Sequence, residues 1–308
     1  MNIRLWLKIS MLIFAALALS GEEAIAELKI VATTQDLASI VREIGGDHVS
    51  VTSIARGYQD AHYLLAKPSY MVKMNRADLL VYQGLQLEIG WLPLLIRGAR
   101  NPKIRIGQPG HLNVSSAIDP IEIRGIKIDR SLGDIHPLGN PHYQLDPENG
   151  ILMANLIADR LTELDSENDS YFKNNLDHFV NKLEIKIKEW RKRLEKLRHK
   201  KIVTYHLTWS YFFNQFEIDY GGVIELRPGI QPTPKELAKL ADKMKRQKTK
   251  LIIQANYYVT GFADILSQKT GAKLLVLPAS VGGVPDAKDY IGLFEYLVSK
   301  FEKVIPAL

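Results

Sequence analysis

The feature that most constrains the fold is a long amphipathic segment between residues 172 and 197. Apolar side chains recur there at spacings of three and four residues, which is the period of an α-helix. The members of this stripe are Phe172, Leu176, Phe179, Leu183, Ile187, Trp190, Leu194 and Leu197. A helix of this length spans roughly 40 Å, enough to run along two domains. A coiled coil has a similar pattern, but the β/α alternation on both sides favours a rigid helix between two lobes.

The segment before this helix alternates between strand and helix patterns. Strands are predicted at residues 28–34, 48–54, 78–82 and 103–107, and helices at 37–44, 68–76, 91–99 and 147–164. The run at 78–82 is mostly apolar and bounded by turn residues, as expected for a buried parallel strand. Residues 108–140 show no regular pattern.

The alternation resumes after the long helix. Strands are predicted at residues 201–206, 219–226, 251–254 and 273–277, and helices at 209–216, 234–247, 261–269 and 286–304. Thr233, Pro234 and Glu236 form a capping box with proline at the first helical position. We therefore predict an α/β protein with two (β/α)-type lobes, parallel sheets and one long rigid linker helix. The predicted parts are an N-terminal lobe at 27–168, the linker helix at 169–200 and a C-terminal lobe at 201–308.

The N-terminus has the layout of a secretory signal. Arg4 and Lys8 precede an apolar run, and Ala24-Ile25-Ala26 forms a cleavage motif, so residues 1–26 are predicted to be removed. The chain has no cysteine, which excludes disulfides, thiolate metal sites and a lipidated cysteine. No later stretch is apolar enough to span a membrane. These observations predict a periplasmic protein that is not a lipoprotein and does not insert into the membrane.

The charge of the chain is basic, with a net charge of +6. Much of the excess positive charge lies between residues 182 and 201, a segment that contains ten Lys or Arg and three Glu. We interpret this as a solvated helix face, because an exported protein does not meet nucleic acid in its compartment.

Three histidines lie where an α/β protein places its ligands. His206 ends a strand, His62 follows a strand, and His142 lies in the loop before a helix that starts at Asp146-Pro147. Ligands in parallel sheets bind beyond the carboxyl ends of the strands, so a site made from all three would lie between the lobes. Imidazole is the commonest metal ligand, and a nitrogen-rich set favours Zn²⁺ over other first-row metals.

The other histidines are weaker candidates. We expect His48, His111, His178 and His199 at the surface, whereas His136 could be a ligand, a group behind a ligand or a surface residue. The sequence has no G-x-S-x-G, H-E-x-x-H or G-x-x-x-x-G-K motif, so a nucleophile elbow, a zincin helix and a P-loop are absent. Three aromatic residues after His206 are expected to pack in a core: Trp209, Tyr211 and Phe212.

Taken together, these motifs resemble the zinc/manganese-type solute-binding proteins of ABC importers, the TroA-like group. The similar segments are Asp60-Ala61-His62 with Lys67-Pro68-Ser69, residues 140–147 around His142, and residues 205–212 around His206. The resemblance covers nearly the whole chain after the signal. It implies a metal held at the lobe interface by His62, His142 and His206 for delivery to a membrane permease.

One position departs from the family pattern. The fourth ligand of the family is usually an aspartate near a late strand, and Ala279 stands there in this chain. The candidates for the fourth ligand are therefore His136, Glu225, Asp286 or a water molecule. The histidine-rich loop of many zinc importers is also missing.

The sequence thus predicts a monomeric solute-binding protein, not an enzyme, that carries Zn²⁺, or next Mn²⁺, to an ABC permease. Two alternatives stay open. Three histidines and a water are also the layout of a catalytic zinc, so the first alternative is an exported zinc hydrolase. The basic face of the long helix would suit an exported adhesin or interaction protein.

Overall fold

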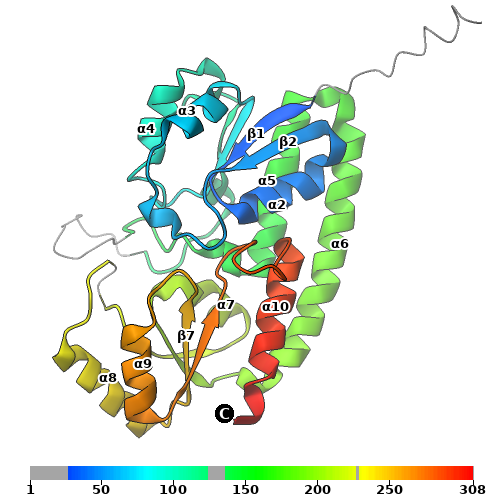
Figure 1. Cartoon of the computed structure of the whole chain (residues 1–308). Coiled ribbons are helices and arrows are strands. Elements are labelled where there is room, and N and C mark those ends of the chain that lie inside the picture. Colours follow the sequence, from blue (N-terminus) through cyan, green and yellow to red (C-terminus); the bar gives the residue numbers. More distant parts are fainter. Residues whose placement is uncertain (1–26, 124–135, 227–228, 308) are drawn as a thin grey trace, which may run out of the picture.

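The computed structural model describes residues 27–123, 136–226 and 229–307. In this part of the chain there are two sheets of four parallel strands each, with helices packed around them. Figure 1 shows the two lobes one above the other, with α6 (Asp169–Leu194) running along both. The predicted α/β fold of two lobes and one long linking helix is confirmed. The predicted signal segment, residues 1–26, lies outside the described residues.

The first lobe is built on a sheet with the order β2-β1-β3-β4. Its strands are β1 (Leu28–Ala32), β2 (Val49–Ser53), β3 (Leu79–Tyr82) and β4 (His111–Asn113). Its helices are α2 (Gln35–Gly45), α3 (Pro68–Asn75), α4 (Leu92–Ala99) and α5 (Pro147–Leu164). β2 lies on one side of β1 and β3 lies on the other, so the direction in which strands are added reverses at β1. Such a reversal opens a crevice at the carboxyl ends of the strands.

The second lobe repeats this arrangement with the order β6-β5-β7-β8. Its strands are β5 (Lys201–Thr204), β6 (Asp219–Val223), β7 (Leu251–Ala255) and β8 (Lys273–Leu277). Its helices are α7 (Ser210–Gln215), α8 (Pro234–Gln247), α9 (Gly261–Thr270) and α10 (Tyr290–Glu302). The predicted capping box is present, since Thr233 and Glu236 exchange side-chain and backbone hydrogen bonds at the start of α8.

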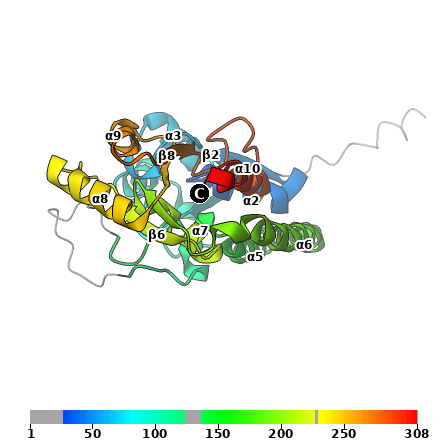
Figure 2. The same cartoon turned by 90° about the horizontal axis from the view of Figure 1, so that it is seen from below.

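Helix α6 joins the cores of the two lobes. Most of its apolar stripe is buried, and the ring of Trp190 stacks on Phe294 of α10 at 5.4 Å between centroids. Seen from below in Figure 2, α5 and α6 lie side by side, with α10 next to α2. Each fully buried large apolar side chain contributes about 1.5–3 kcal/mol to folding. The apolar stripe on α6 therefore packs against the cores of both lobes and joins them.

Two predicted elements show the largest differences from the structure. The strand predicted at residues 103–107 is wrong, because residues 102–104 form a 3-10 turn and β4 begins at His111, paired with β3. The last helix begins at Tyr290 rather than Asp286, and Asp289 caps it by accepting a hydrogen bond from the backbone N–H of Gly292. Within the described ranges, no helix combines the length and the apolar character needed to cross a membrane.

Candidate metal centre

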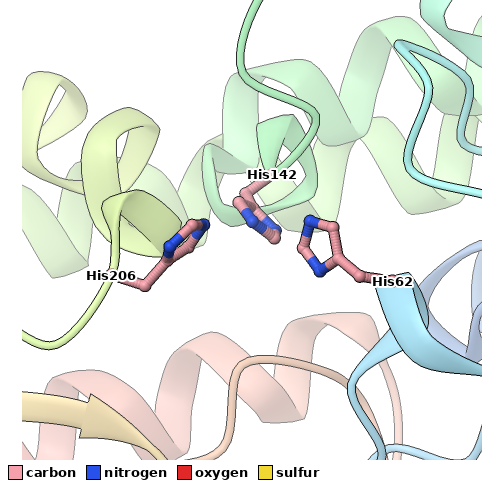
Figure 3. Close-up of side chains that lie close together, drawn as sticks. All are labelled: His62, His142 and His206. Carbon is pink, nitrogen blue, oxygen red and sulfur yellow. The ribbon is translucent and has the colours of Figure 1, made fainter. Parts of the chain in front are cut away.

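The three predicted ligand histidines meet between the two lobes. One ring nitrogen from each of His62, His142 and His206 lies within 4.8 Å of the other two. Figure 3 shows the rings turned toward one another, with His142 between the other two. His142 and His206 are buried and His62 is partly buried. Residues far apart in the sequence thus form one compact cluster of imidazoles.

His62 is held by the aspartate two residues before it. Asp60 caps the 3-10 turn Ala61–Tyr63 that follows β2, and its Oδ1 accepts from the backbone N–H of His62 at 3.0 Å. The same oxygen lies 2.6 Å from Nδ1 of His62. Burial opposes ionisation of Asp60, but the hydrogen bond and charge of His62 outweigh it and lower the pKa of the carboxyl. Asp60 therefore fixes the proton of His62 on Nδ1 and leaves Nε2 for a ligand.

His142 is positioned by a loop that ties the lobes together. The side chain of Asn140 accepts from the backbone N–H of His142 at 2.9 Å and donates to the carbonyl of Leu207 at 2.7 Å. Leu207 follows His206, so one amide connects the neighbourhoods of two ligand candidates. Nε2 of His142 is buried and has no hydrogen-bond partner in the described part of the chain. Burial lowers the pKa of His142 well below its usual value, so the ring is neutral at pH 7.

His206 lies just beyond β5 and is paired with the carboxylate of Glu225, which lies just beyond β6. Nδ1 of His206 lies 2.8 Å from Oε2 of Glu225, and both side chains are buried. A carboxylate behind a histidine fixes the tautomer and raises the basicity of the other nitrogen. With Nδ1 of His62 and of His206 each bound to a carboxylate, Nε2 is the nitrogen that either ring can offer to an ion.

The space beside these rings is small. A cavity of about 30 Å³ is lined by His62 and His142 together with Asp36, Tyr257 and Ala279. This is room for an ion or for one or two water molecules, and not for an organic substrate. A larger apolar cavity of about 550 Å³ lies beside β3 and α4, and none of the three histidines lines it.

The candidates for a fourth ligand differ in their surroundings. Ala279 does line the small cavity but offers no donor atom. Glu225 is engaged with His206, and Asp286 is exposed. His136 approaches the cluster, with its Nε2 3.1 Å from Nε2 of His62. Burial, followed by the nearby His62, lowers the pKa of His136 to about 3, so this ring is neutral as well.

Sequence reasoning missed three residues that shape this site. Asp60 and Asn140 orient His62 and His142, and each stands two positions before its histidine, a spacing that could have indicated this role. Asp36 is buried beside the cavity and binds Ser280 and the backbone N–H of Val281 in the other lobe. No local pattern marks Asp36, because its partners lie more than 240 positions away.

Comparison with known proteins assigns the family. The model of the family described as zinc-uptake complex component A, periplasmic (ZnuA), matches residues 30–304. The chain belongs to the ZnuA family. The resemblance to zinc/manganese-type solute-binding proteins of ABC importers is thereby confirmed.

Relatives by sequence carry names from metal transport. The chain is 28% identical over 264 residues to the metal ABC transporter substrate-binding lipoprotein ScbA of Streptococcus cristatus, covering 84% of this chain and 80% of ScbA. It is also 28% identical to the manganese ABC transporter substrate-binding lipoprotein PsaA of Streptococcus mitis, covering 78% of this chain and 76% of PsaA. These names describe substrate-binding proteins and not enzymes, in agreement with the prediction of a solute-binding protein that is not an enzyme.

Solved structures share the fold. A crystal structure of ZnuA superimposes with a TM-score of 0.74 at 23% identity, covering 90% of this chain and 98% of that one. The manganese-bound periplasmic metal-binding protein from Candidatus Liberibacter asiaticus gives a TM-score of 0.74 at 20% identity, covering 91% and 100%. At these identities the likeness establishes the ZnuA fold for this chain.

The predicted localisation needs correction. A periplasmic protein that is not a lipoprotein was expected from the signal-like N-terminus and the absence of cysteine, but the relatives ScbA and PsaA are named lipoproteins. The predicted localisation is therefore wrong, because the absence of cysteine bears on one attachment chemistry and does not fix the compartment. The relatives support the broader statement that this ZnuA-family chain is an exported substrate-binding protein.

Proposed function

We propose that this chain is the substrate-binding protein of an ABC metal importer, and that it carries a divalent transition-metal ion on Nε2 of His62, His142 and His206. The observation that carries the proposal is the buried Nε2 of His142, which has no hydrogen-bond partner among the described residues and faces two other imidazoles. A buried polar atom without a partner costs about 1–3 kcal/mol. A cation at this point would satisfy it.

Zn²⁺ is the ion that this donor set favours, with Mn²⁺ second. Imidazole nitrogen suits Zn²⁺, whereas Mn²⁺ prefers carboxylate, carbonyl and water oxygens. The carboxylates of Asp60 and Glu225 stand behind the histidines and not among the proposed donors. They supply negative charge close to the cation and fix the ligand tautomers, as in other histidine-zinc sites.

Delivery to a membrane permease follows from the family and from the position of the site. The ion would lie between two lobes, with His62 and His142 from the first lobe and His206 from the second. We propose an ABC permease as the partner that receives the ion, and a monomer as the form that carries it.

The test is metal binding by the full chain and by single His→Ala variants. Zn²⁺ affinity is measured by competition with a chromophoric chelator, and elemental analysis gives the metal content of protein from its native compartment. Each of His62→Ala, His142→Ala and His206→Ala should weaken Zn²⁺ binding by at least about 100-fold, since each removes one donor. Wild-type affinity in all three variants would show that the ligand assignment is wrong.

A further inference from the structure

The large cavity of about 550 Å³ in the first lobe lies apart from the three ligand histidines, beside β3 and α4. Figure 1 shows α4 on the side of that lobe away from α6. The volume falls in the range of about 300–1,000 Å³ that is typical of pockets for small organic ligands. The cavity at the metal centre measures only about 30 Å³. The large cavity can therefore accept an organic molecule that the metal centre cannot.

The walls of the large cavity are mostly apolar. Three of the side chains that line it are strongly exposed for their type, since Ile89 is 67%, Ile106 83% and Leu138 57% exposed. The other apolar lining residues are Leu85, Leu92, Pro93 and Ile96. Exposed apolar side chains that gather around a cavity are typical of a ligand-binding groove. The occupant should therefore have an apolar part.

One wall of the cavity is a turn in an uncommon backbone conformation. Gly84, Leu85 and Gln86 have consecutive positive φ values of 82°, 49° and 69°, and all three line the cavity. Residues other than glycine rarely adopt positive φ, and such positions cluster at ligand sites. Leu87, the next residue, lines the small cavity at the metal centre. This short turn therefore borders both cavities and separates them.

Three arginines also line the large cavity, namely Arg97, Arg100 and Arg105. All three are exposed, and none forms an ion pair or a side-chain hydrogen bond with another residue of the described ranges. A guanidinium group binds carboxylate and phosphate oxygens through two parallel N–H donors. The cavity thus combines apolar walls with positive charge that no described residue neutralises.

The other polar groups of the cavity already have partners within the protein. The two carboxylate oxygens of Glu88 accept hydrogen bonds from a hydroxyl and two backbone N–H groups. The hydroxyl of Tyr82 lies 3.1 Å from Nε2 of His111. The side-chain oxygen of Asn113 accepts from the following turn. The guanidinium groups are therefore the charged groups that remain available to a ligand.

We propose that this cavity binds an acyl-chain anion, a molecule with an unbranched apolar tail and one acidic head group. The tail packs against α4 and the turn at residues 84–89, and the head group binds to the arginines. A sugar or a nucleotide would lose hydrogen bonds to water against walls that are mostly apolar. The inference is independent of the proposed metal carrier, since none of the three ligand histidines lines the cavity.

The first experiment compares decanoate, decanol and acetate by calorimetry on the full chain, with a chelator present so that no carboxylate binds to a metal ion. Decanoate has both the tail and the charge, decanol has only the tail, and acetate has only the charge. Decanoate should bind saturably at one site. Decanol and acetate should each bind at least about tenfold more weakly, because each loses one of the two contributions.

The second experiment uses variants of the cavity wall. Ile106→Asp places a negative charge at a side chain that is 83% exposed, so the substitution spares the core. This variant, and separately Arg97→Ala combined with Arg105→Ala, should weaken decanoate binding at least about tenfold. Ile185→Asp on α6 and Arg246→Ala on α8 are matched controls at exposed positions outside the cavity, and both should bind decanoate as wild type does. Thermal unfolding verifies that all variants are folded.

Several results would overturn the inference. Wild type without saturable decanoate binding has no such site, and equal affinities for decanol and decanoate would mean that the arginines do not select an acid. Unchanged decanoate affinity in Ile106→Asp would place the ligand elsewhere. Loss of decanoate binding in His62→Ala would place it at the metal centre. Cosedimentation with phosphatidylglycerol vesicles identifies the source of the anion: a lipid if Ile106→Asp abolishes it, and a free acid if wild type does not sediment.

Discussion

Glu225 and His206 form a buried carboxylate-imidazole pair, with 2.8 Å between Oε2 and Nδ1. Glu225 follows β6 and His206 follows β5, and these two strands are neighbours in the second sheet. The pairing of the strands brings the carboxylate behind the imidazole. The orientation of His206 is therefore a property of the sheet and not of its own loop.

Replacing Glu225 should weaken metal binding without removing a ligand. Glu225→Ala is expected to lower Zn²⁺ affinity roughly 10–100-fold, because a carboxylate behind a histidine fixes its tautomer and basicity. Glu225→Gln should lose less, since its amide oxygen still accepts from Nδ1. Chelator competition measures both, with the exposed Glu43→Ala as the control. Equal affinities of Glu225→Ala and wild type would contradict this role.

The side-chain amide of Asn140 should stabilise the contact between the two lobes, because it bonds to the backbone of both. Asn140→Ala removes the hydrogen bonds to the backbone of His142 and of Leu207. We expect a loss of about 1–3 kcal/mol in the free energy of unfolding, because buried groups are left without partners, and weaker Zn²⁺ binding. Urea unfolding and chelator competition test the two effects. Unfolding that is unchanged within error would show that water replaces the amide.

Gly57 marks a close approach of the two lobes. A Cβ at this position would overlap the backbone of Val281 and Gly283 in the second lobe. Gly57→Ala should push the loops apart and weaken Zn²⁺ binding at least about tenfold, because His62 and His206 would separate. Gly261→Ala is the matched control, since the space around that Cβ is open. Retention of wild-type affinity by Gly57→Ala would mean that the loops adjust without moving the histidines.

The buried Asp36 should make the metal-free protein less stable as pH rises. Burial raises the pKa of Asp36 from 3.8 to about 6, against the hydrogen bonds of Ser280 and Val281. Between pH 4 and 6 the Asp36 carboxyl therefore keeps its proton in the folded state and loses it in the unfolded state. The contribution of Asp36 to the free energy of unfolding is thus present at low pH and is lost as pH rises. A difference of about two pH units corresponds to about 3 kcal/mol.

This effect is measured by urea unfolding of wild type and Asp36→Asn, both with a chelator, at pH 4, 5, 6 and 7. Asp36→Asn removes the titrating group and keeps a similar shape. The stability of wild type relative to Asp36→Asn should rise by up to about 3 kcal/mol from pH 7 to pH 4. A difference that stays constant over this range would show that Asp36 titrates alike in the folded and unfolded states.

Much of the fold is predictable because it depends on local signals. The three-and-four spacing of apolar residues predicts α6, Asp146-Pro147 predicts the start of α5, and Thr233 with Glu236 predicts the start of α8. The strand β4 escaped prediction for a physical reason. It has only three residues, too few to show an alternation, and it is a strand because it pairs with β3.

The sequence by itself determined the class of the protein and the three candidate ligand histidines. It placed His62, His142 and His206 at loop ends, where local turn and cap chemistry presents a side chain. Only the tertiary structure decided that these rings meet, that His136 reaches His62, and that Asp36 binds the other lobe. Those relationships join residues from separate strands and separate lobes, and burial of a common core along α6 brings them together. No spacing along the chain encodes such contacts, since they depend on how the sheets and the long helix pack.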